Sequence, residues 1–178
     1  EIYNPTANSI DLSQYFVARY NNGSTSNTSG ATASIAIQLT GTIAPYSTHV
    51  GVLDKRDPMG TGQEAPVWDD LQAKADEFYC PVYADSYAFY WNGNDAVVLV
   101  KGLTINGDGS NVLDVIGVIG EDPGSAWVDA DGGWLTRDKT LGKKSEIQMG
   151  SGPKLNALQD TFAYVQYNVW GKNCIINN

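Results

Sequence analysis

Short runs of alternating apolar and polar residues dominate the chain and predict an all-β structure. Between residues 34 and 40, Ile35, Ile37 and Leu39 alternate with Ala36 and Gln38, which is the period of a strand with one inward face. Similar runs, rich in Val, Ile, Tyr and Trp, suit pleated sheets better than helices. They predict further strands over 11–20, 43–53, 87–91, 96–101, 111–117, 140–144 and 162–170.

Two turn sequences predict adjoining hairpins in the middle of the chain. Asn92-Gly93 is typical of a tight hairpin turn and would join the strand over 87–91 to the strand over 96–101. The cluster at 106–109, Asn-Gly-Asp-Gly, would join that strand to the next one over 111–117. By contrast, the segment 21–34 is too polar and small to bury anything, so we expect a loop there.

One segment, 66–78, has helical spacing. Its apolar residues recur near a period of 3.6, Pro66 suits the first helical position, and Asp69 and Asp70 suit the first turn. The sequence therefore predicts one short helix within an otherwise β structure.

Length and charge restrict the class of protein. A chain of 178 residues fits a single domain, and no apolar run approaches the roughly 20 residues of a membrane span. The formal net charge of −9 disfavours free-standing binding to nucleic acid or to anionic lipid surfaces. We therefore expect no membrane insertion, and partners other than nucleic acid.

The cysteine and histidine content leaves few options for metal chemistry. There are two cysteines, Cys80 and Cys174, and a single histidine, His49, so no zinc ligand set is present. In an oxidising compartment the two thiols would close a long loop and stabilise the fold by about 4–5 kcal/mol in the chain-entropy model. A Cys80–Cys174 disulfide and two separate thiols both remain open.

Several segments, in collinear order, resemble the lamin tail domain family in its bacterial form. The resemblance lies in Glu1–Thr6 with Ile10–Ser13 as an opening strand pair, in 41–47, in 91–99 as a central hairpin, in Asp114–Trp127, and in Asp138–Leu141 with Lys143 and Lys144. The segment at 54–86 departs from the family and would be an insertion, and the tail from about 150 to 178 aligns only loosely.

This resemblance implies a single immunoglobulin-like β-sandwich domain over 1–178 with one short inserted helix and no catalytic residues. It also implies a secreted or cell-surface module of a multidomain bacterial protein, accessory to an extracellular nuclease or another hydrolase. Its partner would be a protein, a cell-surface polymer or a neighbouring domain of the same precursor. A module that binds nucleic acid or carbohydrate is the alternative, and a hydrolase is the second alternative.

Candidate ligand-binding residues follow the central hairpins. Trp127 and Trp134 flank a Gly-rich acidic loop and could stack on a sugar or a base, or could plug one end of the fold. The densest basic stretch follows them and could seat an acidic partner or form a solvated strand face; it consists of Arg137, Lys139, Lys143 and Lys144.

Calcium binding and catalysis have weaker signals. The runs Asp129-x-Asp131-Gly132 and Asn106-x-Asp108-x-Ser110 alternate oxygen ligands, but Thr140 and Gly117 stand where an EF-hand loop needs its acidic twelfth residue. We therefore interpret both runs as turns and expect no cofactor. Catalytic motifs are absent, the Asp pairs suit caps and turns, and His49 on an alternating strand suits a structural role.

Overall fold

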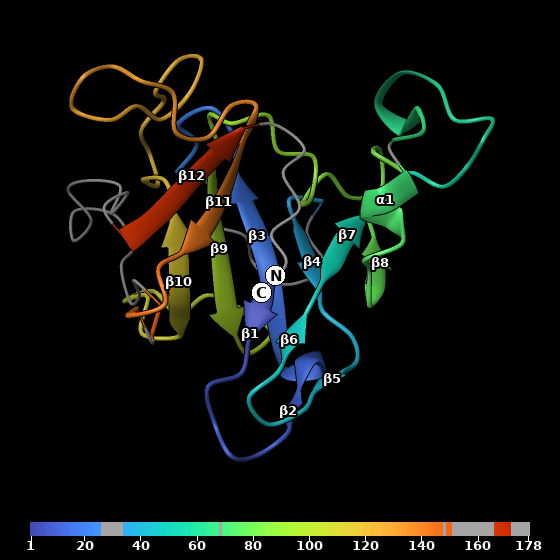
Figure 1. Ribbon diagram of the computed structural model, residues 1–178, viewed down its shortest axis with the longest axis vertical. Helices are drawn as coiled ribbons and strands as arrows, with labels where there is room; N and C mark the ends of the chain where they lie inside the picture. The colour runs from blue at the N-terminus through green and yellow to red at the C-terminus, as the bar shows by residue number, and fades with distance from the viewer. Residues whose placement is uncertain (26–33, 68, 148, 151–165, 172–178) are drawn as a thin grey trace. The chain divides into compact units, whose positions relative to one another are not determined.

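The computed structural model describes residues 1–25, 34–67, 69–147, 149–150 and 166–171. Over these residues the chain is all-β, with short, mostly antiparallel strands and very little helix (Figure 1). It divides into two compact units, the first comprising 1–18, 28–90 and 101–104, and the second comprising 19–27, 91–100 and 105–178. Among the described residues, no helix is long and apolar enough to span a bilayer.

The first unit is a set of short paired strands. Three pairs are antiparallel: β1 (Ile2–Tyr3) with β6 (Thr48–His49), β2 (Ile10–Asp11) with β5 (Thr42–Ile43), and the first part of β3 (Tyr15–Tyr20) with β4 (Ala36–Gln38). One pair is parallel: β7 (Gly51–Leu53) with β8 (Glu77–Tyr79). The 3₁₀ turn η1 (Leu12–Gln14) separates β2 from β3, and Asp11 caps it through a 2.9 Å hydrogen bond from the Ser13 N–H.

Apolar residues of these strands and turns are buried to 1% exposure or less, as expected for a core that excludes water. The largest of them are Leu12, Phe16, Leu39 and Ile43. The predicted one-sided alternation over 34–40 is wrong in detail. Ala36 is buried while Ile37 is only half-buried, so both faces of β4 are partly covered.

The two opening segments form β1 and β2, but each pairs with a later strand and not with the other. Asn4, which follows β1, is fully buried. Its Nδ2 donates to the carbonyls of Asn8 (2.7 Å) and Ala44 (3.0 Å), and its Oδ1 accepts from the Thr6 N–H (3.0 Å). Because a buried amide is stable only when its polar atoms are satisfied, this side chain holds the crossing between the opening segments and the β5–β6 turn.

The helix predicted over 66–78 is much shorter than expected. The structure has the α-helix α1 over Asp69–Gln72, preceded by the 3₁₀ turn η2 over Gly62–Glu64. Phe78, expected on the apolar face of the helix, lies instead in β8, where it aligns with Val52. Parallel pairing with β7 forms the backbone hydrogen bonds of this segment, so the expected insertion contributes a strand to the first unit.

The predicted strand over 87–91 is also wrong, and with it the hairpin at Asn92-Gly93. Residues 88–89 form a turn, closed by a 3.1 Å hydrogen bond from the Tyr90 N–H to the Tyr87 carbonyl. The centre of the Phe89 ring lies 5.1 Å from the centre of the Tyr79 ring. The turn therefore places aromatic side chains in the interior, whereas a strand would direct successive side chains to opposite faces.

The second predicted hairpin is confirmed in the second unit. β9 (Ala96–Lys101) pairs antiparallel with β10 (Val112–Ile116), with Val100 opposite Val112 and Val97 opposite Ile116. The connecting turn is closed by the Gly109 N–H and the Asn106 carbonyl at 2.9 Å. The predicted strands near the C-terminus correspond to β11 (Lys139–Lys143) and β12 (Tyr167–Gly171), an antiparallel pair, although residues 162–165 lie outside the described residues.

Candidate functional site

A tight hairpin over Trp127–Leu135, hereafter the Trp134 hairpin, presents aromatic side chains in the second unit. Val128 and Trp134 form an isolated antiparallel bridge, and the Leu135 N–H donates to the Trp127 carbonyl at 2.8 Å. At the tip, Asp129 Oδ1 accepts from the N–H groups of Asp131 (3.0 Å) and Gly133 (2.7 Å). The carboxylate therefore closes the turn, as Asp side chains commonly do.

The two tryptophans of the hairpin have opposite environments. Trp127 is only 5% exposed and packs in a core cluster with Val118, Leu135 and Tyr167. Its indole N–H donates to the Asp95 carbonyl at 3.1 Å. The buried position corrects the prediction that Trp127 belongs to a ligand-binding pair, because the core needs a large aromatic side chain whose N–H is satisfied.

Trp134, by contrast, is 45% exposed. The Arg137 guanidinium carbon lies 5.1 Å from the centre of the Trp134 ring, within the range of a cation–π contact. The structure therefore brings these two predicted site residues together, and it leaves part of the indole open to solvent.

Thr136 and Gly93 fix the backbone that carries Arg137. Thr136 Oγ1 donates to the Gly93 carbonyl and accepts from the Trp127 N–H at 3.1 Å. A Cβ on Gly93 would lie 2.6 Å from the Arg137 Cα, and Gly93 has a φ of +105°. This close approach requires glycine, which explains the Asn92-Gly93 sequence without the predicted hairpin.

The basic stretch does not form one free cationic patch. Lys139 and Arg137 are exposed, but Lys143 forms a 2.6 Å ion pair with Asp114 and lies 5.7 Å from the centre of the Tyr167 ring. Lys144 follows β11 and is half-buried, and its N–H donates to the Gln166 carbonyl at 2.9 Å. Burial also raises the pKa of Tyr167, so this ring stays neutral beneath Lys143.

A buried ion pair supports the second unit and was not predicted from the sequence. Asp95 binds Arg19 through Oδ2 to Nε at 3.0 Å and through Oδ1 to Nη2 at 3.2 Å. The two side chains are 8% (Arg19) and 1% (Asp95) exposed. Because Asp95 follows the Asn-Gly-Asn turn in an otherwise solvated pattern, the sequence carried no signal of its burial.

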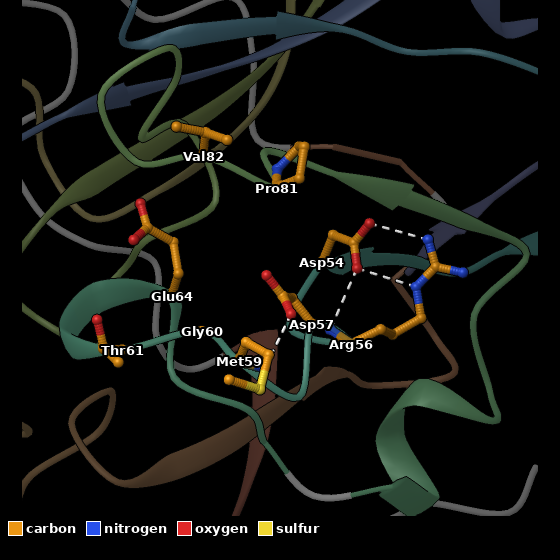
Figure 2. A pocket seen from close by; sticks show the side chains of 9 residues that line it. All are labelled: Asp54, Arg56, Asp57, Met59, Gly60, Thr61, Glu64, Pro81 and Val82. Carbon is orange, nitrogen blue, oxygen red and sulfur yellow. Dashed lines mark hydrogen bonds and ion pairs between the residues drawn. The ribbon is translucent and has the colours of Figure 1, made fainter.

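A groove of about 610 Å³ lies in the first unit (Figure 2). Figure 2 shows the Asp54–Arg56 pair on one side of the groove and Glu64 on the other. Asp54 holds Arg56 through two hydrogen bonds of 2.9 and 2.8 Å, which lower the pKa of its carboxyl. Glu64 accepts from the Tyr83 N–H at 3.0 Å. The first contact fixes one side of the groove, and the second joins Glu64 to the loop that carries Val82.

His49 is buried, as the structural interpretation of the sequence expects. Its Nε2 lies 3.3 Å from the Tyr79 hydroxyl, which also accepts a 3.2 Å hydrogen bond from the Thr40 N–H. Burial lowers the pKa of His49. The contact joins β6 to β8 within the first unit.

The two acidic loops considered for calcium use their oxygens within the protein. Asp129 caps its own turn, and Asp108 Oδ1 accepts from the Ser110 N–H at 3.0 Å. Asn106 donates to the Ser110 hydroxyl at 2.8 Å. In the part of the chain that the structure describes, no group of three or more His, Cys, Asp or Glu residues could hold a metal ion.

Among the described residues Cys80 has no disulfide partner; it is 3% exposed, and its Sγ lies 3.4 Å from the Ser86 hydroxyl oxygen. Burial raises the pKa of this thiol. Its alternative disulfide partner, Cys174, lies outside the described residues.

Comparisons with protein-family models, with curated proteins and with solved structures found no match to this chain. The lamin-tail resemblance therefore stays a prediction that rests on the sequence segments. Of the predicted site residues, Trp134 and Arg137 form the best-defined surface feature, and the residues that position it, Gly93 and Thr136, lay outside the sequence prediction.

Proposed function

We propose that this chain is a non-catalytic interaction module of the lamin-tail type, an immunoglobulin-like sandwich that works as an accessory part of a secreted or cell-surface bacterial protein. In this role it holds a partner, a polymer or a neighbouring domain and performs no reaction. The proposal combines the all-β architecture with the sequence resemblance.

The Trp134 hairpin is the observation that carries the proposal. Trp134, a residue that is 45% exposed, lies on a turn closed by backbone hydrogen bonds, with Arg137 against its ring. Exposed aromatic and arginine side chains are the residue types that contribute most to binding interfaces. A rigid backbone lowers the entropy lost when such side chains make contact.

The contacts of several titratable side chains support a role without catalysis. Arg19 and Asp95 neutralise each other inside the second unit, and His49 bonds to Tyr79 inside the first. A general base or a nucleophile needs access to a substrate, and these groups are committed to packing and strand contacts.

Retention and activity screens on the whole chain test the proposal. The protein, fused to a fluorescent reporter, is applied to immobilised polysaccharides, extracellular-matrix proteins and DNA, and in parallel to chromogenic ester, peptide, glycoside and phosphodiester substrates. We expect retention on at least one surface and no turnover. Turnover that is lost in His49→Ala or Asp131→Ala would overturn the proposal. It would also be overturned if none of the surfaces retained the protein.

A ligand-binding module for nucleic acid or carbohydrate is the second candidate function. The cation–π contact between Arg137 and Trp134 favours it, because an aromatic ring beside a guanidinium can stack on a flat ligand and donate hydrogen bonds to it.

A further inference from the structure

We infer that the Trp134 hairpin binds a neutral, hydroxyl-rich polysaccharide, with one sugar ring stacked on the open part of the Trp134 indole and Arg137 donating hydrogen bonds to its hydroxyls. This inference rests on the proposed function, and it names the site and the chemical class of the ligand.

The hairpin presents the indole on a backbone that is already ordered. The bridge between Val128 and Trp134, the Leu135–Trp127 hydrogen bond and the Asp129 cap together fix the turn. Below it, Trp127 anchors the hairpin in the core cluster. A ligand therefore meets a platform whose backbone needs no further ordering, so more of the contact energy remains for affinity.

The exposed apolar area matches a small ligand better than a folded partner. Trp134 and Val128 are 45% and 48% exposed, and bridge partners in a hairpin carry their side chains on the same face. Since a whole tryptophan covers up to about 250 Å², the two side chains offer roughly 200 Å². A stable protein interface needs about 800 Å² on each partner. One pyranose ring covers an indole, and a repeating polymer can re-engage the same site after each dissociation.

Charge decides between a sugar and a nucleic acid. The chain has a net charge of −9, and Asp129 and Asp131 stand at the tip of the same hairpin. Although Arg137 attracts phosphate, these carboxylates and the overall negative field oppose the approach of a polyanion to the indole. A neutral sugar pays no such penalty, and the guanidinium of Arg137 offers donors that suit hydroxyl oxygens.

Affinity electrophoresis in native gels tests the inference. The whole chain migrates through plain gels and through gels that contain mixed-linkage β-glucan, xylan, galactomannan or glycogen, with single-stranded DNA as a separate arm. The variants are Trp134→Ala, Trp134→Phe, Arg137→Ala and, as a matched control, Tyr3→Ala, which removes an aromatic side chain that is 51% exposed in the first unit. Mobility in the plain gel corrects for the charge lost in Arg137→Ala.

We expect at least one neutral polysaccharide to retard the wild type and Tyr3→Ala equally. Trp134→Ala should weaken binding at least tenfold, Arg137→Ala several-fold, and Trp134→Phe should retain most of the affinity because the ring remains. The inference is overturned if no polysaccharide retards the wild type. It is also overturned if a polysaccharide retards Trp134→Ala as strongly as the wild type. Retardation by single-stranded DNA without retardation by any polysaccharide also overturns it, while the proposed function then stands.

Discussion

Removal of the Asp95 carboxylate is the sharpest test of what holds the second unit together. In the native structure this side chain is 1% exposed and accepts hydrogen bonds from Arg19 and, at 3.3 Å, from the Asn92 N–H. Asp95→Ala takes both acceptor oxygens away and removes the carboxylate that pairs with the Arg19 guanidinium, whose side chain is 8% exposed. The Asp95 carbonyl remains, so the hydrogen bond from Trp127 is retained.

The expected cost is large because a buried charge loses its partner. Breaking a buried ion pair from one side costs about 3–5 kcal/mol. Domains of ordinary size have free energies of unfolding of about 5–15 kcal/mol, so the variant should lose about a fifth of the total or more. Replacing both partners by apolar residues, as in Arg19→Met with Asp95→Leu, should recover most of the loss, since neither charge then remains buried.

Urea unfolding followed by tryptophan fluorescence measures these effects. With a slope of about 2 kcal/mol/M, the Asp95→Ala midpoint should fall by about 1.5–2.5 M. Asp54→Asn is the matched control, because its partner Arg56 has a side chain that is 55% exposed and solvent screens the pair, so the midpoint should hardly move. An Asp95→Ala midpoint within about 0.5 M of the wild type would refute the reasoning, as would a double variant less stable than the single one.

Three further predictions follow from individual contacts. Gly93→Ala should destabilise the fold by about 1–3 kcal/mol in urea, because its Cβ would overlap the Arg137 backbone at a φ of +105°; unchanged stability would show that the close approach is not required. His49, whose burial lowers its pKa, should make the protein less stable as the pH falls below about 6.5, because the unfolded chain takes up the proton first while the folded form keeps the ring neutral. Thermal unfolding between pH 7.5 and 5.5 should therefore show a smaller pH dependence in His49→Gln than in the wild type, and equal slopes would contradict the assignment. Cys80 should react slowly with a thiol reagent in the native protein and rapidly in urea, because its thiol is 3% exposed and has a raised pKa; rapid labelling of Cys80 in native buffer, located by peptide mass, would show that it is accessible.

The β9–β10 hairpin was predictable because its information is local. Val-rich apolar runs and an Asn-Gly-Asp-Gly turn specify two strands and their connection within about twenty residues. The same rules were misleading at 87–91 and at 66–78. There the apolar spacing was present, but contacts with residues distant in sequence, such as Phe89 with Tyr79 and Phe78 with Val52, determined the backbone.

For the candidate site, the sequence identified residue types and the structure assigned their roles. Trp127 and Trp134 are the same type of residue and flank one loop, yet the first is buried and the second is exposed to solvent. The sequence predicts a solvated cation at Lys143, but in the structure this side chain forms an ion pair with Asp114. Burial and pairing depend on neighbours brought together by tertiary contacts, which no local pattern encodes.

The amino-acid sequence by itself determined the β character, the acidic charge and the position of the central turn, since these depend on residue type and on spacing over a few positions. The tertiary structure alone decided which aromatic ring stays in water, which ion pair is buried and why Gly93 must lack a side chain. The physical reason is that desolvation and close packing act between atoms that are distant along the chain, so their outcome exists only once the chain has folded.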